Sequence, residues 1–147
     1  MKIGLAADHC GYSKKTKIIK YLNHKGLETI DYGTDSNKIT DYPQYAFKLG
    51  EAVIKKEVDL GIIICGTGIG VSIAANKVKG IRCAKVNNAF EAKFAKLHNN
   101  ANMLAFGRKM HMFIIKDMID TFLKTPIATE ERYTRRNKQI AEYEAKK

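Results

Sequence analysis

Cysteine is scarce in this chain of 147 residues, and its pattern excludes the usual structural uses. Cys10, Cys65 and Cys83 are odd in number, form no CxxC pair and have no zinc-site spacing with histidine. They support neither a disulfide framework nor a zinc centre. We therefore expect free thiols in a reducing cytoplasm and no bound metal.

Long apolar runs are also missing. None approaches the ~20 residues that cross a bilayer. Only five uncharged residues stand between Lys2 and Asp8, too few for the apolar region of a signal peptide. We therefore expect a cytoplasmic protein with no membrane partner.

Arginine is sparse although the chain is basic. The formal charge is +11, but just five of the 26 basic residues are arginine, and the lysines are scattered over the whole sequence. Scattered lysines are typical of a solvated surface, and no aromatic and basic residues interleave as they do in RNA-binding modules. A nucleic-acid-binding function therefore rests on charge alone, and we expect no nucleic acid partner.

Hairpin dipeptides, internal repeats, low-complexity tracts and linkers are absent. Apolar runs predict strands over residues 2–7, 27–32, 60–64, 81–86 and 102–106. Helical patterns lie between them and predict inward faces at Ile73 and Ala74; at Phe90, Phe94 and Leu97; and at Phe113, Ile115, Ile119 and Phe122. The alternation predicts one domain, residues 1–147, with a three-layer α/β/α sandwich around a Rossmann-like five-stranded parallel sheet.

Residues 59–76 combine the features of an anion site. A β-branched run predicts a strand buried on both faces, and glycines at 66, 68 and 70 then permit a tight turn with open amides before a helix. Such a helix N-terminus binds anions. Cys65 stands at this turn. A cysteine is often a small buried hydrophobe, but this position also stabilises a thiolate, and we favour that interpretation.

Nucleotide fingerprints do not fit this turn. GxGxxG requires glycine where Val71 or Ile73 stands, no acidic residue follows at the usual distance, and neither Lys-Ser nor Lys-Thr follows the glycines. We therefore expect neither NAD nor ATP.

The carboxyl ends of parallel strands meet at one edge of a sheet, so Asp8, His9, Cys65 and Lys109 are expected to lie there. Residues 98–99 end the helix after the fourth strand, so the fold alone does not bring them to this edge, although a neighbouring subunit could. A thiolate beside amide donors and an imidazole suits attack on a carbonyl or proton abstraction beside one.

A series of motifs extends over nearly the whole chain. In order they are residues 7–11 (ADHCG), 41–43 (DYP), 65–70 (CGTGIG), 75–77 (ANK), 80–82 (GIR), 98–99 (HN) and 102–107 (NMLAFG). Together they resemble the ribose/galactose isomerase family, in its ribose 5-phosphate branch. The resemblance implies an aldose–ketose isomerase of the pentose phosphate pathway. It would interconvert ribose 5-phosphate and ribulose 5-phosphate through a cis-enediolate, with no cofactor.

The resemblance also implies residue roles. Cys65 would move the proton between C2 and C1, and His98 would open the furanose ring with help from Thr67 and Asp8. The amides of residues 66–70 would hold the enediolate oxygen. The implied substrate-binding residues are Asp8, His9, Tyr42, Gly66, Thr67, Gly68, Ile69, Gly70, Asn99, Lys109, Arg132 and Arg136.

The tail, residues 129–147, is charged and weakly amphipathic, so we expect it to lie on a neighbouring surface or a partner subunit. Arg132 and Arg136 are four residues apart and share a helix face, where the resemblance implies that they hold the phosphate. Family members usually carry arginine where this chain has Lys109, and often carry histidine where it has Tyr133. The resemblance further implies a homodimer or homotetramer with sites shared between subunits.

Two other enzymes remain as alternatives. An isomerase of allose or galactose 6-phosphate would belong to the same family, but the galactose branch lacks part of the Cys65 and His98 pair, which favours ribose 5-phosphate here. A cysteine hydrolase built on the same pair would instead form an acyl-enzyme.

Overall fold

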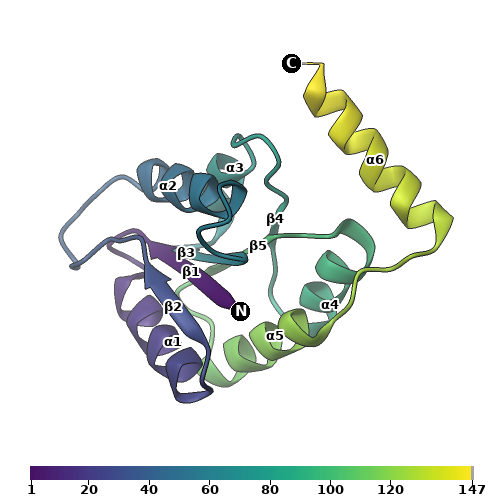
Figure 1. Cartoon of the computed structure of the whole chain (residues 1–147). Helices are drawn as coiled ribbons and strands as arrows, with labels where there is room; N and C mark the ends of the chain where they lie inside the picture. The colour runs from purple at the N-terminus through teal and green to yellow at the C-terminus, as the bar shows by residue number, and fades with distance from the viewer. Residues whose placement is uncertain (147) are drawn as a thin grey trace.

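A five-stranded parallel sheet forms the centre of the protein in the computed structural model, which describes residues 1–146 (Figure 1). The strands are β1 (Lys2–Ala7), β2 (Glu28–Asp31), β3 (Leu60–Cys65), β4 (Cys83–Lys85) and β5 (Met103–Gly107). Their order across the sheet is β2-β1-β3-β5-β4, and every neighbouring pair is parallel. The predicted sheet is confirmed; Lys147, at the end of the predicted tail, lies outside the described residues.

Alternation of side chains along β3 divides the core in two. All six residues of β3 are buried, because helices cover both faces of the sheet. Ile62 and Ile64 belong to one core, whereas Ile63 and Cys65 belong to the other. The period of two along the strand thus directs the Cys65 side chain toward one layer of helices.

Helices form the two outer layers of the predicted sandwich (Figure 1). On one face lie α1 (Tyr12–His24), α4 (Ala89–Asn99) and α5 (Met112–Lys124), and on the other lie α2 (Pro43–Ile54) and α3 (Ile69–Ala75). The layer of α2 and α3 covers Cys65. On α5 the residues predicted to point inward at Ile115, Ile119 and Phe122 are buried. No helix within residues 1–146 is long and apolar enough to cross a membrane.

Three large apolar side chains with inward helical spacing are exposed. The exposed fractions are 71% for Phe90, 77% for Phe113 and 59% for Ile73. α4 instead buries the small residues Ala92 and Ala95. The prediction is wrong at these three positions, because spacing identifies the residues that share a helix face and does not identify the face that meets the core.

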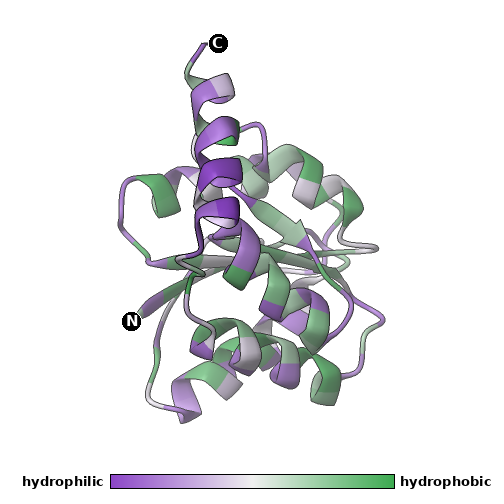
Figure 2. Ribbon diagram, turned by 90° about the vertical axis from the view of Figure 1, so that its right-hand side faces the viewer, coloured by the Kyte–Doolittle hydropathy of each residue, from purple (hydrophilic) through white to green (hydrophobic). Residues whose placement is uncertain are grey.

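The last helix, α6 (Glu131–Ala145), stands away from the body of the protein (Figure 1). None of its residues, all of which are described, is buried, and Figure 2 shows its mostly hydrophilic surface. Hydrogen bonds tie it to the body: Asn137 Nδ2 donates to the main-chain oxygen of His98 (3.0 Å), and the Gly80 amide donates to the Glu144 carboxylate (2.9 Å). The helix therefore has little packing surface within its own chain.

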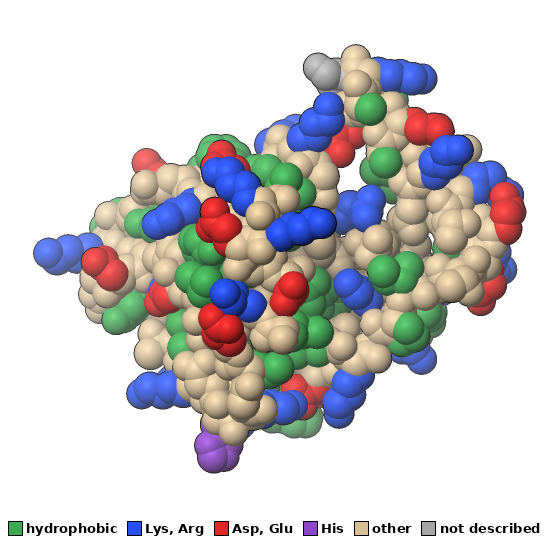
Figure 3. All heavy atoms as spheres, viewed as in Figure 1, with side chains coloured by type: hydrophobic (Ala, Val, Ile, Leu, Met, Phe, Trp, Pro, Cys, Tyr) green, Lys and Arg blue, Asp and Glu red, His purple; other side chains and the backbone are tan. Residues whose placement is uncertain are grey.

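A cavity of about 750 Å³ lies beside α6, and the opening between this helix and the body is visible in Figure 3. Its walls combine Ile140 of α6 with Ile81, Cys83 and Ala95 of the body. The walls also carry charged side chains, among them Lys79, Arg82 and Glu144, so the cavity is mixed in character.

Candidate active site

The candidate site lies at the carboxyl ends of β1 and β3. These strands are neighbours, but the chain leaves β1 in one direction and continues from β3 in the other, so the strand order reverses between them. Asp8 follows β1 and Cys65 ends β3, and the Asp8 amide donates to the main-chain oxygen of Ile64 (3.3 Å). Crevices at such reversal points are where open parallel sheets bind ligands.

The Cys65 thiol lies against the glycine-rich turn that begins α3. Its sulfur accepts a hydrogen bond from the main-chain N–H of Gly68 at 3.1 Å, and the residue is 5% exposed. Gly68 has φ +82°, and a Cβ there would lie 2.7 Å from the Phe106 main chain. Only glycine allows both this backbone conformation and this close approach to β5. The turn thus aims an amide at the sulfur.

The rest of the turn contacts Tyr42. A Cβ at Gly70 would lie 2.6 Å from the Tyr42 ring, so the ring packs directly over the start of α3. Thr67 is exposed, and its Oγ1 accepts a hydrogen bond from the Ile69 amide (3.2 Å). The CGTGIG motif and the DYP segment, which begins 24 residues earlier, therefore form one surface.

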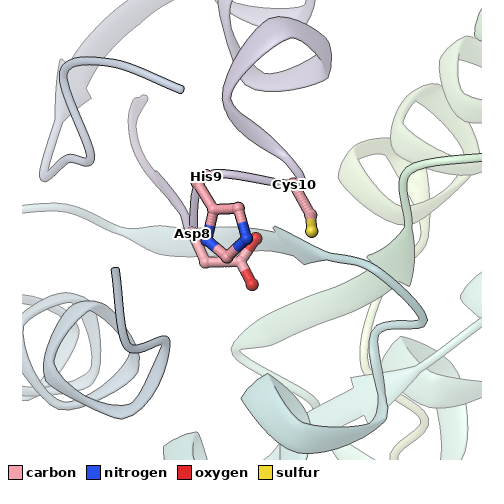
Figure 4. A group of neighbouring side chains, drawn as sticks. All are labelled: Asp8, His9 and Cys10. Atoms are coloured by element: carbon pink, nitrogen blue, oxygen red, sulfur yellow. The ribbon is translucent and has the colours of Figure 1, made fainter. Parts of the chain in front are cut away.

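Asp8, His9 and Cys10 form a cluster beside this turn (Figure 4). Asp8 is buried, and its Oδ1 accepts a hydrogen bond from the Gly11 amide (3.1 Å) in the turn before α1. His9 Nδ1 lies 3.2 Å from the carbonyl oxygen and 3.3 Å from the amide of Thr40. The loop before α2 thus fixes the orientation of the imidazole ring.

Lys109 follows β5 at the same edge of the sheet. The Arg108 amide donates to the main-chain oxygen of Cys65 (2.9 Å), which joins the turn after β5 to the end of β3. The Lys109 side chain is exposed. It therefore places a positive charge near the edge without a fixed geometry of its own.

His98 lies in a different part of the chain's surface. Its ring stacks on Tyr133 of α6, with centroids 4.0 Å apart and planes at 10°, and also contacts Phe94 at 4.6 Å. The inner side of its helix, α4, belongs to the core on the opposite face of the sheet from Cys65. As expected from the fold, a single chain does not bring the two residues together.

The two predicted phosphate arginines lie on α6, the helix whose Tyr133 stacks on His98. Arg132 and Arg136 are exposed on α6, one turn apart, and the Arg132 guanidinium lies 4.6 Å from the centroid of the Tyr133 ring. Asn99 is exposed at the end of α4, and its Nδ2 donates to the Phe94 oxygen (3.4 Å).

The predicted site residues therefore form two groups. At or next to the sheet edge lie Asp8, His9, Tyr42, Cys65, Gly66, Thr67, Gly68, Ile69, Gly70 and Lys109. On α4 and α6 lie His98, Asn99, Arg132 and Arg136.

Sequence reasoning missed two residues that lie next to predicted site residues. Thr40 holds the His9 ring, and it stands in a polar loop with no motif to mark it. Cys10 has no role among the predicted site residues, yet it is half-buried, and its sulfur lies within 4.8 Å of a carboxylate oxygen of Asp8 and a ring nitrogen of His9. Its position directly after those two residues was the available signal.

Comparison with known proteins agrees with this geometry. The sequence model described as Ribose/Galactose Isomerase matches residues 3–140. This chain belongs to the ribose/galactose isomerase family. The resemblance seen in the motifs is thereby confirmed, and the chain is an isomerase.

Individual relatives cover most of the chain. Ribose-5-phosphate isomerase B of Escherichia coli is 45% identical, with 83% of each chain covered. A galactose-6-phosphate isomerase subunit of Clostridium acetobutylicum is 40% identical over 95% of this chain and 79% of that one. The structure of Clostridium thermocellum ribose-5-phosphate isomerase B is 46% identical and superposes with a TM-score of 0.95, covering 99% of both chains.

Proposed function

We propose that this protein interconverts ribose 5-phosphate and ribulose 5-phosphate by transfer of a proton between two neighbouring carbons. The observation that carries the proposal is the Cys65 sulfur, which lies at the reversal point of the sheet and within hydrogen-bonding distance of a glycine-turn amide. A base beside main-chain donors is what enediolate chemistry requires. The relatives named for ribose 5-phosphate support this choice of substrate.

The proton transfer conserves atoms and electrons within the sugar. The Cys65 thiolate takes the proton from C2 of the open-chain aldose, and the C2–H electrons form the C1–C2 double bond. The C1 oxygen gains the negative charge, and the amides of residues 66–70 stabilise it. Return of the proton to C1, with transfer of the hydroxyl proton from O2 to O1, gives the ketose.

Ring opening needs a proton donor at the ring oxygen. We assign this role to His98, with assistance from Thr67 and Asp8. His9 and Asn99 would bind sugar hydroxyls, and Arg132 and Arg136 the phosphate, because two guanidinium groups one turn apart suit phosphate oxygens. Tyr42 and Lys109 complete the proposed set of substrate-binding residues.

Because the two groups of site residues lie on different layers, this assignment requires two copies of the chain. We propose a homodimer or homotetramer in which α4 and α6 of one copy complete the sheet-edge site of another. Two observations support it: α6 buries none of its residues, and the apolar side chains of Phe90 on α4 and Ile73 on α3 are exposed. With its three free thiols, the assembly fits a reducing cytoplasm.

The chemistry is tested with Cys65→Ala in a coupled assay for ribulose 5-phosphate formation, with and without EDTA. We expect kcat to fall about 10³-fold, since a general base contributes on that order. Wild-type activity is expected to be the same in EDTA. Cys83→Ala is the matched control and should retain activity. A Cys65→Ala protein with normal kcat would contradict the proposal.

The shared site is tested by mixing subunits. Cys65→Ala and His98→Ala are each inactive in this scheme, but a hybrid dimer has one site with both residues intact. Random reassortment makes half of the dimers hybrids with one active site of two, so about a quarter of wild-type activity should return. If both residues of a site came from the same chain, mixing would restore nothing.

A second candidate substrate is a hexose 6-phosphate. The observation in its favour is the 40% identity to the galactose-6-phosphate isomerase subunit. Measurement of kcat/KM for ribose 5-phosphate, allose 6-phosphate and galactose 6-phosphate distinguishes the candidates. We expect ribose 5-phosphate to give the largest value.

A further inference from the structure

Three potential metal ligands stand side by side at the end of β1. Asp8 offers a carboxylate oxygen, His9 a ring nitrogen and Cys10 a sulfur, and these three atoms all lie within 4.8 Å of one another. Figure 4 shows the Asp8 carboxylate, a nitrogen of the His9 ring and the Cys10 sulfur on the same side of the turn. Asp8 is buried, and the other two residues are half-buried, so solvent reaches the cluster only in part.

The main chain of Thr40 lies against one nitrogen of the His9 ring. The His9 Nδ1 lies 3.2 Å from the carbonyl oxygen of Thr40. A histidine that binds a metal usually donates its other ring N–H to a carboxylate or a main-chain carbonyl, which fixes the tautomer and the ring orientation. The tautomer in which Nδ1–H donates to the Thr40 oxygen leaves the Nε2 lone pair for a cation, whereas in the other tautomer Nδ1 accepts from the Thr40 amide at 3.3 Å.

We propose that Asp8, His9 and Cys10 bind a divalent cation of borderline softness, of which Zn²⁺ is the representative. Oxygen, nitrogen and sulfur ligands at 2.0–2.3 Å place the three atoms of a tetrahedral site about 3.3–3.7 Å apart. The observed separations of up to 4.8 Å exceed this range by about 1 Å, so the side chains must move closer when the cation binds. The Cys10 thiol releases its proton to solvent as the metal binds.

Cys10 is the residue that makes the cluster a chelate. The isomerisation assigns it no role, whereas Asp8 and His9 are the residues proposed to handle the sugar. A cation held by all three would occupy the carboxylate and the imidazole at once. Zn²⁺ is therefore an inhibitor that competes with the sugar, and not a cofactor. This consequence rests on the proposed function, but binding of the cation does not.

Binding is measured first, without sugar. Metal-free protein is titrated with Co²⁺, whose thiolate complexes show a sulfur-to-metal charge-transfer band, and Zn²⁺ is then added as competitor. We expect one site per chain, with the band abolished in Cys10→Ala and Cys10→Ser and Zn²⁺ affinity lowered at least about tenfold. Cys83→Ala is the matched control, because Cys83 is buried within β4, and its band should be unchanged.

Binding of the cation by Cys65, the third thiol, would overturn the proposal. If the band persists in Cys10→Ala and disappears in Cys65→Ser, the cation binds Cys65 and the proposed site does not exist. The same holds if wild-type protein shows no thiolate band at all. A folded Cys10 variant is recognised by its unchanged urea unfolding midpoint.

Activity is measured second. Zn²⁺ should raise the apparent KM of wild-type enzyme for ribose 5-phosphate, EDTA should reverse the effect, and Cys10→Ala should keep its basal activity and resist Zn²⁺. If Zn²⁺ inhibited Cys10→Ala and wild type equally, the proposal that this site is inhibitory would be refuted. A protein that binds Co²⁺ through Cys10 but does not isomerise ribose 5-phosphate would refute the proposed function and leave the metal site standing.

Discussion

The main-chain N–H of Gly68 donates a hydrogen bond to the sulfur of Cys65 across 3.1 Å. The bond joins the end of a buried strand to the first turn of α3, so the orientation of the thiol depends on the backbone of one glycine. Substitutions in the turn should therefore affect the chemistry in proportion to how far they move this amide.

Gly68→Ala should disable the site, whereas Gly66→Ala should not. A Cβ at residue 68 would require φ +82° and an approach of 2.7 Å to the Phe106 main chain, whereas a Cβ at residue 66 meets no atom within 4 Å. We expect Gly68→Ala to lower kcat about 100-fold and the free energy of unfolding by about 1–3 kcal/mol. Steady-state kinetics measure the effect on kcat, and urea unfolding measures the effect on stability. If Gly68→Ala and Gly66→Ala had equal effects, this role of Gly68 in the turn would be refuted.

Alkylation should distinguish the three thiols. Burial raises the pKa of Cys83 to about 12, so this thiol stays protonated at pH 7–9 and should not react with iodoacetamide. We expect inactivation to follow labelling of Cys65 and to be slowed by ribulose 5-phosphate. Peptide mass spectrometry identifies the labelled residue. Cys10→Ala should be inactivated at the wild-type rate, and protection of Cys83 alone by the sugar would contradict the assignment.

Arg136→Ala should weaken substrate binding, with Arg135→Ala as its control. Arg136 shares a helix face with Arg132, whereas Arg135 already forms an ion pair with Glu131 (2.5 Å). Loss of a charge-assisted contact to phosphate is worth about 1.5–3 kcal/mol, or roughly 10- to 100-fold in KM, with kcat little changed. Kinetics with ribose 5-phosphate test this, and a larger effect at Arg135 would place the phosphate elsewhere.

Asp120 should contribute to stability in a pH-dependent manner. Burial alone would raise its pKa, but hydrogen bonds from Lys25 (2.5 Å) and Tyr21 (2.7 Å) outweigh burial and lower the pKa below the usual 3.8. The charged form therefore stabilises the fold above that value, and the contribution is lost as the pH falls through the lowered native pKa. Asp120→Asn should reduce the free energy of unfolding by about 1 kcal/mol at neutral pH.

Urea unfolding at pH 7 and near pH 2 tests the Asp120 prediction, because the difference between wild type and Asp120→Asn should vanish once the carboxyl is protonated. Asp117→Asn, exposed on the same helix, is the control and should change little at either pH. A difference that persists in acid would mean that the amide disturbs packing and that charge is not the cause.

The sequence predicts local structure and the sheet-edge site well, because both depend on neighbours along the chain. The β-branched run before Cys65 and the glycines after it specify a buried strand and its turn without reference to distant residues. The exposed ring of Phe90 could not be predicted in the same way. Its spacing suits a core stripe, but the close packing of α4 selects the small Ala92 and Ala95 instead.

The placement of His98 follows from topology and lies beyond local pattern. Its helix covers one face of the sheet while the side chain of Cys65 points to the other, and only the strand order and the alternation along β3 decide this. The cluster at Asp8 was obscured for a different reason. Adjacent residues in a turn can converge or diverge, and the backbone conformation after β1 determines which occurs.

Because α6 stands away from the body of the protein, specific activity in the proposed assembly should depend on protein concentration. A 15-residue helix with no buried side chain is marginal in water, so in the proposed assembly the order of α6 would depend on contacts with a second subunit as well as on those to its own chain. In the proposed assembly those contacts also hold the phosphate arginines. Specific activity should therefore fall on dilution as subunits separate and the tail frays, and high substrate concentration should restore it by favouring reassociation.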